Sequence, residues 1–407
     1  MSALGIDFGT SNTAASILVD GTPRLLELEP GETTLPTVVF LDFGAGKTLY
    51  GRNGVSAMTS GQDGRFMRAL KSILGTPLAR EKRQFLNEKL SLIEVIARFL
   101  GEIRARAEQS TGATYDQAVS GRPVRFHSKS EARNAQAAVD LEEAYHLAGF
   151  SSVSFLPEPE AAALATGGSG RMLIVDIGGG TSDFTLCDRV DGETRIHASQ
   201  GIRMGGTDFD RILNLSHAMP LLGYGAEIGN EMGSGSHTAP RALFHDLAAW
   251  EKIAFVYSPS LLRDVKKWVR LAPEAHLFER LADVLEMHLG HDIAYAIEAG
   301  KIRANSGDSG RVVLDVVESG LEAWISPQDV RLQLAAQAEE IAACAQETLD
   351  IAGCPAASVD RIVYVGGSSL MSVIRQRIEA MFPNAVPETS EVFTAVASGL
   401  ALEAARR

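Results

Sequence analysis

The chain has 407 residues, of which 45% are hydrophobic and 22% charged, so it can build two to four structural units with buried cores. Its formal net charge of −13 argues against a nucleic-acid partner, because binding a phosphate backbone requires clustered Lys and Arg. Three widely spaced cysteines fit reduced packing residues, and no uncharged apolar run matches a membrane span. The N-terminus has no room for a signal peptide, so we expect a globular cytoplasmic protein with no membrane partner.

The chain opens with a short apolar strand that leads into a turn rich in hydroxyl groups. Residues 4–16 read LGIDFGTSNTAAS, which places Asp7, Gly9, Thr10 and Ser11 at the turn. Backbone N–H groups can point inward at a glycine turn and bind an anion, and hydroxyl groups add further donors. The turn is therefore a candidate phosphate site carried by a strand–turn–strand hairpin.

Residues 41–112 interrupt this first sheet and read as an inserted, mainly helical lobe. Within it, apolar residues recur at helical spacing from residue 90 to 107. A strand at 118–126 then returns to the core, and a helix follows at 130–148. Small residues at 161–165 predict a helix that packs closely against a neighbour.

Residues 173–186, LIVDIGGGTSDFTL, repeat the strand–turn–strand pattern in the middle of the chain. A β-branched strand ends at Asp176, the glycines Gly178–Gly180 leave no Cβ in the way of an anion, and Thr181 adds a hydroxyl group. Neither hairpin has the GxxxxGK[ST] pattern, and neither opens into a helix as a Rossmann glycine motif does. Two such hairpins predict a duplicated architecture with phosphate held between the turns.

The second half repeats the plan of the first. Its later elements are predicted in this order: strands at 171–199, a turn at 201–210, a mostly helical insertion at 212–305, strands at 312–317 and 320–325, and a long helix at 327–352. The Gly, Ser and Asn content of 223–239 predicts a mobile loop.

A third glycine turn follows a strand at 360–365, where Gly366, Gly367 and Ser368 precede an amphipathic helix. Alone, this turn reads as a tight connection with a serine N-cap. After two phosphate hairpins, it predicts the close approach of a base or sugar to the backbone. A terminal helix at 390–405 ends in basic residues that suit its C-terminal dipole.

These elements predict two lobes of duplicated α/β structure. The first lobe covers 1–170, with its core at 1–40 and 113–170 and its insertion at 41–112. The second lobe covers 171–389, with its core at 171–211 and 306–389 and its insertion at 212–305. The helix within 390–407 is expected to pack back on the first lobe.

Five motifs occur in an order that resembles the nucleotide-binding domain of the seventy-kilodalton heat-shock (DnaK-type) chaperones. The motifs are IDFGTSN, PEPEAAALATG, DIGGGTSDF, GGTDFD and YVGGSSL, which resemble the first phosphate segment, the first connecting helix, the second phosphate segment, the turn after it and the adenosine segment. The set covers nearly the whole chain. The resemblance implies the actin-like ATPase (ribonuclease H-like) fold, with two duplicated α/β lobes and helical insertions around a nucleotide cleft.

The resemblance also implies a Mg·ATP site. The residues implied at the phosphates are Gly9, Thr10, Ser11, Asn12, Gly178, Gly179, Gly180 and Thr181. Asp7, Asp176 and Asp183 would surround magnesium, which keeps several of its waters and suits carboxylates that hold those waters.

The catalytic set implied by the resemblance is Lys71, Glu158, Thr181 and Asp183. Lys71 would meet the transferred phosphoryl group, and Glu158 or Thr181 would hold the attacking water. Without the resemblance, Lys71 reads as an ordinary solvated lysine and Glu158 as a surface residue between two prolines.

The base site is implied on the helix at 295–305, where Glu298 and Lys301 lie three apart on one face and Asn305 follows one turn later. Gly366, Gly367 and Ser368 would complete it, and a surface ion pair is the alternative for Glu298 with Lys301. The sequence departs from the family at Asn12, Ile302, Asn305, Leu370 and Phe393. These departures leave the strength and pose of adenine binding open.

No acidic linker, β-sandwich or helical lid follows the terminal helix in this sequence, so we expect a stand-alone ATPase domain that does not itself grip unfolded peptides. The resemblance implies slow Mg-dependent ATP hydrolysis coupled to lobe closure, a chaperone role in protein folding, and a protein partner or client that reads the nucleotide state. Three alternatives stay open: a small-molecule (sugar) kinase on the same fold, an actin-like filament protein, and a nucleotide switch without turnover.

Overall fold

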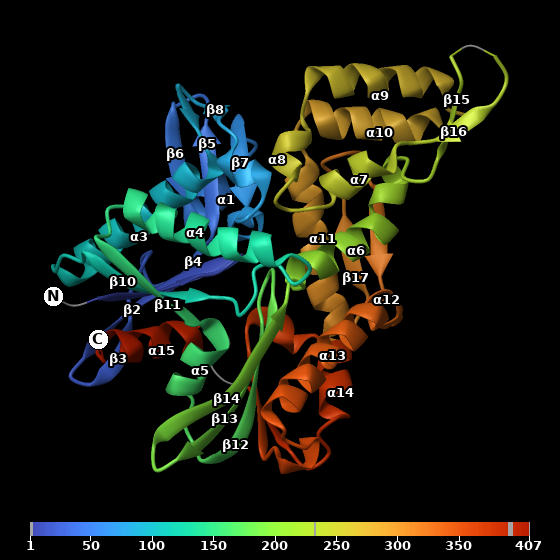
Figure 1. Ribbon diagram of the computed structural model, residues 1–407. Coiled ribbons are helices and arrows are strands. Elements are labelled where there is room, and N and C mark those ends of the chain that lie inside the picture. The colour runs from blue at the N-terminus through green and yellow to red at the C-terminus, as the bar shows by residue number, and fades with distance from the viewer. Residues whose placement is uncertain (1–2, 232, 390–393, 407) are drawn as a thin grey trace. The chain divides into compact units, whose positions relative to one another are not determined.

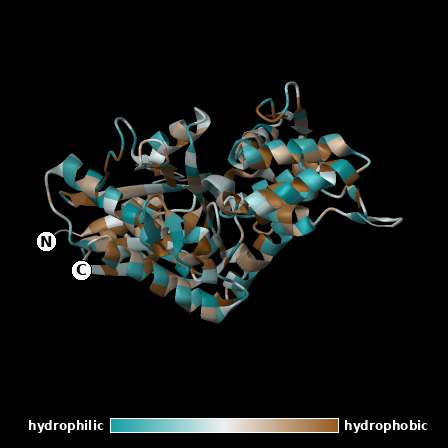
Figure 2. Cartoon of the chain, turned by 90° about the horizontal axis from the view of Figure 1, so that it is seen from above, coloured by the Kyte–Doolittle hydropathy of each residue, from teal (hydrophilic) through white to brown (hydrophobic). Residues whose placement is uncertain are grey.

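The computed structural model describes residues 3–231, 233–389 and 394–406 (Figure 1). The chain forms two compact units, one of residues 1–206 with 337–407 and the other of residues 207–336. Both units mix helices with strands, which confirms the predicted α/β class. Hydrophilic and hydrophobic residues alternate around the helices, as expected where one side of each helix is buried (Figure 2). Among the described residues, none of the helices combines the length and apolar composition needed to cross a bilayer.

The first sheet carries the N-terminal hairpin. Its strands run in the order β11-β10-β1-β2-β3, with β4 paired to β2: β1 (Leu4–Phe8), β2 (Asn12–Val19), β3 (Thr22–Leu25), β4 (Thr34–Pro36), β10 (Gln117–Arg122) and β11 (Ser152–Pro157). β1 pairs antiparallel with β2 and parallel with β10. Helix α4 (Glu131–Leu147) follows β10, and the side chain of Ser130 caps it by accepting from Arg133 N–H.

The second sheet repeats this arrangement. Its strands run in the order β14-β13-β12-β19-β20: β12 (Gly170–Ile177), β13 (Ser182–Val190), β14 (Glu193–Ile202), β19 (Arg361–Val365) and β20 (Val386–Thr389). Again the first strand of the hairpin, β12, pairs antiparallel with β13 and parallel with β19. The predicted duplication of the hairpin is therefore confirmed.

Two helices of small residues share a core with the strands of both sheets. They are α5 (Glu158–Ala165) and α15 (Ala395–Ala404). The helices approach closely because Gly399 has no side chain, and a Cβ at that position would collide with the backbone of Ala161. This close packing confirms the prediction made for 161–165. The expected start of the terminal helix, and Phe393, lie outside the described residues.

The insertion at 41–112 is less helical than its sequence pattern predicts. Its elements are β5 (Val38–Asp42), β6 (Lys47–Tyr50), α1 (Gly51–Thr59), β7 (Gly64–Arg68), η1 (Leu70–Ile73), α2 (Pro77–Arg80), β8 (Arg83–Phe85), β9 (Glu88–Leu90) and α3 (Leu92–Thr111). β5 pairs with both β6 and β7. The prediction missed β7 because its pairing partner lies more than twenty residues away in the sequence.

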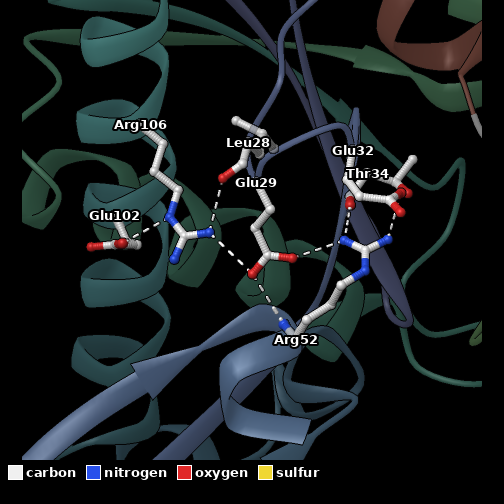
Figure 3. Close-up of polar contacts among 7 residues, drawn as sticks. All are labelled: Leu28, Glu29, Glu32, Thr34, Arg52, Glu102 and Arg106. Carbon is white, nitrogen blue, oxygen red and sulfur yellow. Dashed lines mark hydrogen bonds and ion pairs between the residues drawn. The ribbon is translucent and has the colours of Figure 1, made fainter. Parts of the chain in front are cut away.

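A half-buried carboxylate, Glu29, ties this insertion to the loop between β3 and β4 (Figure 3). Glu29 accepts hydrogen bonds from the guanidinium of Arg52 at 2.8 Å and from that of Arg106 at 3.3 Å. Arg106 also donates to the Leu28 carbonyl at 2.9 Å and binds Glu102 at 2.8 Å. Since Arg52 lies on α1 and Arg106 on α3, the network joins both helices to one loop.

The second unit is mainly helical. Its elements are α6 (Gly206–His217), η2 (Met219–Leu222), β15 (Glu227–Gly229), β16 (Ser236–Thr238), α7 (Arg241–Leu247), α8 (Ile253–Val256), α9 (Pro259–Leu271), α10 (Ala275–Glu286), α11 (Gly290–Asn305), β17 (Gly310–Val313), β18 (Glu322–Ile325) and α12 (Pro327–Gln333). The segment 223–239, predicted to be a mobile loop, contains the hairpin β15–β16.

The helix predicted at 327–352 is in fact two helices, α12 and α13 (Ala335–Ala352). The break falls at Leu334, whose side chain is fully buried. No Gly or Pro marks this position, so the break could not be predicted from a local pattern. The remaining elements of the first unit are η3 (Ala356–Ser358), η4 (Gly367–Leu370) and α14 (Ser372–Glu379).

Candidate nucleotide site

Each sheet ends in a glycine turn of the same construction. In the first hairpin, Gly9 N–H donates to the Asn12 carbonyl at 3.1 Å and closes the turn between β1 and β2. In the second, Gly178 N–H donates to the Thr181 carbonyl at 3.0 Å and closes the turn between β12 and β13. A tight glycine turn of this kind, with no Cβ in the way, has the backbone shape of a phosphate cradle.

The two turns face each other at contact distance. A Cβ placed on Gly179 would lie 2.5 Å from Ser11 Oγ and 3.1 Å from Thr10 Cβ. A Cβ on Gly180 would lie 2.9 Å from Thr10 Oγ1. Glycine is required here because the hydroxyl-bearing turn occupies the space of a side chain. The prediction that the hairpin turns meet is confirmed.

The third glycine turn reaches the same end of β12. Gly366 adopts a φ of 78°, and a Cβ there would lie 2.7 Å from Asp176 Oδ1 and would collide with the Ile177 carbonyl. A Cβ on Gly206 would likewise collide with Ser368 Oγ. The turn formed by Gly366, Gly367 and Ser368 therefore lies beside the second hairpin, within reach of a ligand bound there.

Four carboxylates lie close to these turns, of which Asp176, Asp183 and Glu158 are buried and Asp7 is half-buried. Asp7 is the last residue but one of β1, Asp176 and Asp183 face each other across β12 and β13, and Glu158 begins α5. Burial, followed by the charge of Glu158, raises the pKa of Asp7 and that of Asp183 to about 7. Burial and the same neighbouring charges raise the pKa of Asp176 well above its ordinary value. The floor of the site thus concentrates negative charge in a poorly solvated place.

The site includes one buried lysine, Lys71, whose Nζ donates to Glu158 Oε1. Lys71 lies in η1, a turn preceded by Ala69 in a left-handed conformation, with φ of 60°. The alternative interpretations of Lys71 as a solvated lysine and of Glu158 as a surface residue are wrong, because both residues are at most 9% exposed.

The arrangement fits a hydrated divalent cation better than a direct metal cage. Among the described residues, no group of three or more His, Cys, Asp or Glu side chains is placed to hold a metal ion directly. Asp183 Oδ1 accepts from Val124 N–H at 2.7 Å, whereas its Oδ2 is buried and has no hydrogen-bond partner in the described part of the chain. A buried oxygen of this kind calls for a water or a cation, and Mg²⁺ characteristically retains its waters.

Three residues predicted to bind the adenine base, Glu298, Lys301 and Asn305, lie on α11 in the second unit. The phosphate turns belong to the first unit, so the meeting of these residues with the turns stays a prediction. Lys301 is buried, and its Nζ lies 2.6 Å from Asp210 Oδ1. Asp210 Oδ2 also accepts from Trp250 Nε1 at 3.0 Å. Lys301 is thus a member of a buried ion pair, and its contact with adenine stays a prediction.

The residues at which the sequence departs from the family differ in their exposure to solvent in the described structure. Asn12 is the first residue of β2 and closes the phosphate turn, whereas Ile302 and Leu370 are exposed at the surface. Sequence reasoning missed Arg203, which lies two residues before the Gly205-Gly206 pair and donates to the Ser72 carbonyl at 3.0 Å. Its adjacency to the GGTDFD motif was the only signal in the sequence.

Paired sheets that each end in a glycine hairpin above buried carboxylates define the class of actin-like ATPase folds. Comparison with protein-family models agrees, since the model for Hsp70 protein matches residues 3–220, more than half of the chain. The chain belongs to the Hsp70 family. The match includes both phosphate hairpins, Lys71 and Glu158, and ends shortly after α6.

Curated relatives include the chaperone protein DnaK of several bacteria. The chain is 30% identical to that of Ureaplasma parvum serovar 3 over 216 residues, covering 52% of this chain and 34% of the relative. It is 30% identical to that of Metamycoplasma hominis over 214 residues (51% and 34%) and 31% identical to that of Mycoplasmopsis agalactiae over 214 residues (51% and 33%). The similarity thus spans about a third of each relative's length.

Proposed function

We propose that this chain binds Mg·ATP between the turns at 9–12 and 178–181 and hydrolyses it slowly. One observation carries the proposal: two hydroxyl- and glycine-rich turns meet close to four carboxylates, three of them buried, and a buried lysine. Paired turns of this kind suit a chain of phosphates, and the carboxylates below them suit the cation that accompanies ATP. Nucleotide binding as such is a property of the Hsp70 family, whereas the role of each residue is our assignment.

We assign the residues of the site the following roles in phosphoryl transfer. The glycine turn at 178–180 and the hydroxyls of Thr10 and Ser11 would bind phosphate oxygens. Asp7, Asp176 and Asp183 would hold the waters of Mg²⁺, which when bound neutralises charge on the phosphate oxygens.

Lys71 would add positive charge beside the transferred phosphoryl group, where it lowers the barrier most. Glu158, which now accepts from Lys71, would accept a proton of the attacking water when the lysine turns to phosphate. The Thr181 hydroxyl would help to hold that water in line. Because little covalent chemistry falls to the protein, positioning accounts for most of this catalysis.

A chaperone role follows by analogy with the DnaK relatives. We propose that the nucleotide state changes the arrangement of the lobes and that a protein partner or client reads this change. We also propose a cytoplasmic location and no nucleic-acid partner.

Two measurements test the proposed function. Calorimetry with Mg·ADP and Mg·ATP should give saturable binding, and phosphate release should follow ATP binding in a single turnover. ADP formation that required an added sugar and released no free phosphate would favour the kinase. Sedimentation that depended on ATP would favour the filament, and ATP binding without turnover would favour the switch. The absence of binding by either nucleotide would overturn the proposal.

A further inference from the structure

The segment Arg203–Gly206 lies directly on the triple-glycine turn. It connects β14 to α6 and is the last part of the first unit before the chain enters the second. Gly206 N–H donates to the Gly178 carbonyl at 3.0 Å, and Ser182 Oγ donates to the Met204 carbonyl at 2.8 Å. A Cβ on Gly205 would lie 2.7 Å from the backbone of Gly179, so this segment follows any movement of the turn.

The side chain of Arg203 reaches from this segment to the turn that carries Lys71. Its Nη2 donates to the Ser72 carbonyl at 3.0 Å, and its own N–H donates to Ser128 Oγ at 3.4 Å. Ser72 follows Lys71 directly, and its Oγ lies 3.1 Å from where a Cβ of Gly180 would be. One guanidinium therefore connects the backbone of the two turns that would flank the γ-phosphate.

Two other side chains hold the Lys71 turn from the side of the first sheet. His127, which follows β10, forms a 2.6 Å hydrogen bond between a ring nitrogen and the Leu74 carbonyl. Asp140, on α4, accepts from Gly75 N–H at 2.8 Å. Arg203 adds an anchor from the second sheet, the sheet that carries the triple glycine. The position of Lys71 thus depends on both sheets at once.

The anchor from Arg203 is suited to a fixed role. A guanidinium stays charged at any physiological pH and presents its donors in a rigid fork, so it holds a carbonyl with little loss of freedom. Its charge also reaches the neighbouring anchor, since burial, and after it Arg203 and Arg133, lower the pKa of His127.

We propose that Arg203 is a positioning residue for the proposed ATPase: it couples the triple-glycine turn to the Lys71 turn, so that phosphate bound by one aligns the lysine of the other. The inference rests on the proposed function. Arg203 acts through the Ser72 carbonyl, so its loss displaces Lys71 without removing a phosphate ligand. It therefore lowers the rate of phosphate release and leaves ADP affinity unchanged.

A double-mutant cycle tests this coupling. We expect Arg203→Met to slow single-turnover phosphate release by at least about tenfold, since small misplacements of catalytic groups can cost up to roughly a hundredfold. If Arg203 acts through Lys71, Arg203→Met should add little to the loss already caused by Lys71→Ala. Arg203→Lys should restore part of the rate. Arg195→Met, at an exposed position on β14, the strand that directly precedes Arg203, is the matched control and should behave as the parent.

The outcomes separate this inference from the proposed function. A parent chain that neither binds nor hydrolyses ATP refutes the proposed function itself. The coupling alone is refuted if the parent hydrolyses ATP and Arg203→Met does so at the parent rate. It is also refuted if the rate losses of Arg203→Met and Lys71→Ala multiply in the double variant. Arg203→Gln serves as a second variant if Arg203→Met does not fold, and circular dichroism and ADP binding establish that each variant is native.

Discussion

Replacing Gly179 with alanine tests whether the two phosphate turns are in contact. The added methyl group would lie 2.5 Å from Ser11 Oγ and 3.1 Å from Thr10 Cβ, whereas ordinary contacts begin at 3.4 Å. The hydroxyl of Ser11 can rotate away, but Thr10 Cβ is fixed to the backbone. The turns must therefore separate by at least a few tenths of an ångström. Overpacking of this kind costs roughly 1–3 kcal/mol.

The free energy of unfolding by urea, without nucleotide, measures this cost. Gly178→Ala is the matched control, because a Cβ on Gly178 meets no atom within 4 Å and should leave the stability unchanged. Since the separated turns can no longer hold one phosphate chain together, Gly179→Ala should also weaken ADP binding by on the order of tenfold, which is about 1.4 kcal/mol. Parent-like stability and ADP affinity in Gly179→Ala would show that the turns do not touch.

Three further predictions concern charged groups. Lys71→Ala and Glu158→Ala should each slow single-turnover hydrolysis by at least roughly tenfold with ADP affinity nearly unchanged, and a parent rate in either would refute that residue's role. Asp210→Ala removes the carboxylate that pairs with the buried Lys301 ammonium, so it should lower the free energy of unfolding by urea by about 3–5 kcal/mol. Adding Lys301→Met should recover most of this stability, and a double variant as unstable as Asp210→Ala would contradict the prediction. Lys82 and the capping bonds lower the pKa of Glu94 to about 2, below its ordinary 4.5, so the stability it adds is complete above pH 4.5 and falls as pH drops toward 2. Glu94→Gln should flatten the dependence of unfolding free energy on pH there, and an unchanged slope would argue against the cap.

The sequence predicted the local parts of the site well. The hairpins at the Asp7 and Asp176 strands could be predicted because each combines a short buried strand, a glycine turn and hydroxyl groups within about a dozen residues. The α4 helix, predicted at 130–148, could likewise be read from its local pattern.

Other features depend on contacts that no local pattern encodes. Lys71 and Glu158 lie 87 residues apart, and each alone looks like a surface residue. The resemblance to a family implied that both belong to the site, whereas their pairing with each other was not predicted. Arg203 and Ser72 are 131 residues apart, and the acceptor is a backbone carbonyl, which carries no residue-type signal. Strand β7 was not predicted for the same reason, since its pairing depends on a strand that is distant in the sequence.

A crystal structure of the chain with Mg²⁺ and a non-hydrolysable ATP analogue would show whether ATP binds between the two glycine hairpins. We predict that the β- and γ-phosphates lie between the turns at 9–12 and 178–181. Magnesium waters should contact Asp7, Asp176 and Asp183, and the Lys71 ammonium should have turned from Glu158 to the γ-phosphate. An analogue bound elsewhere, or phosphates that touch neither turn, would contradict the account.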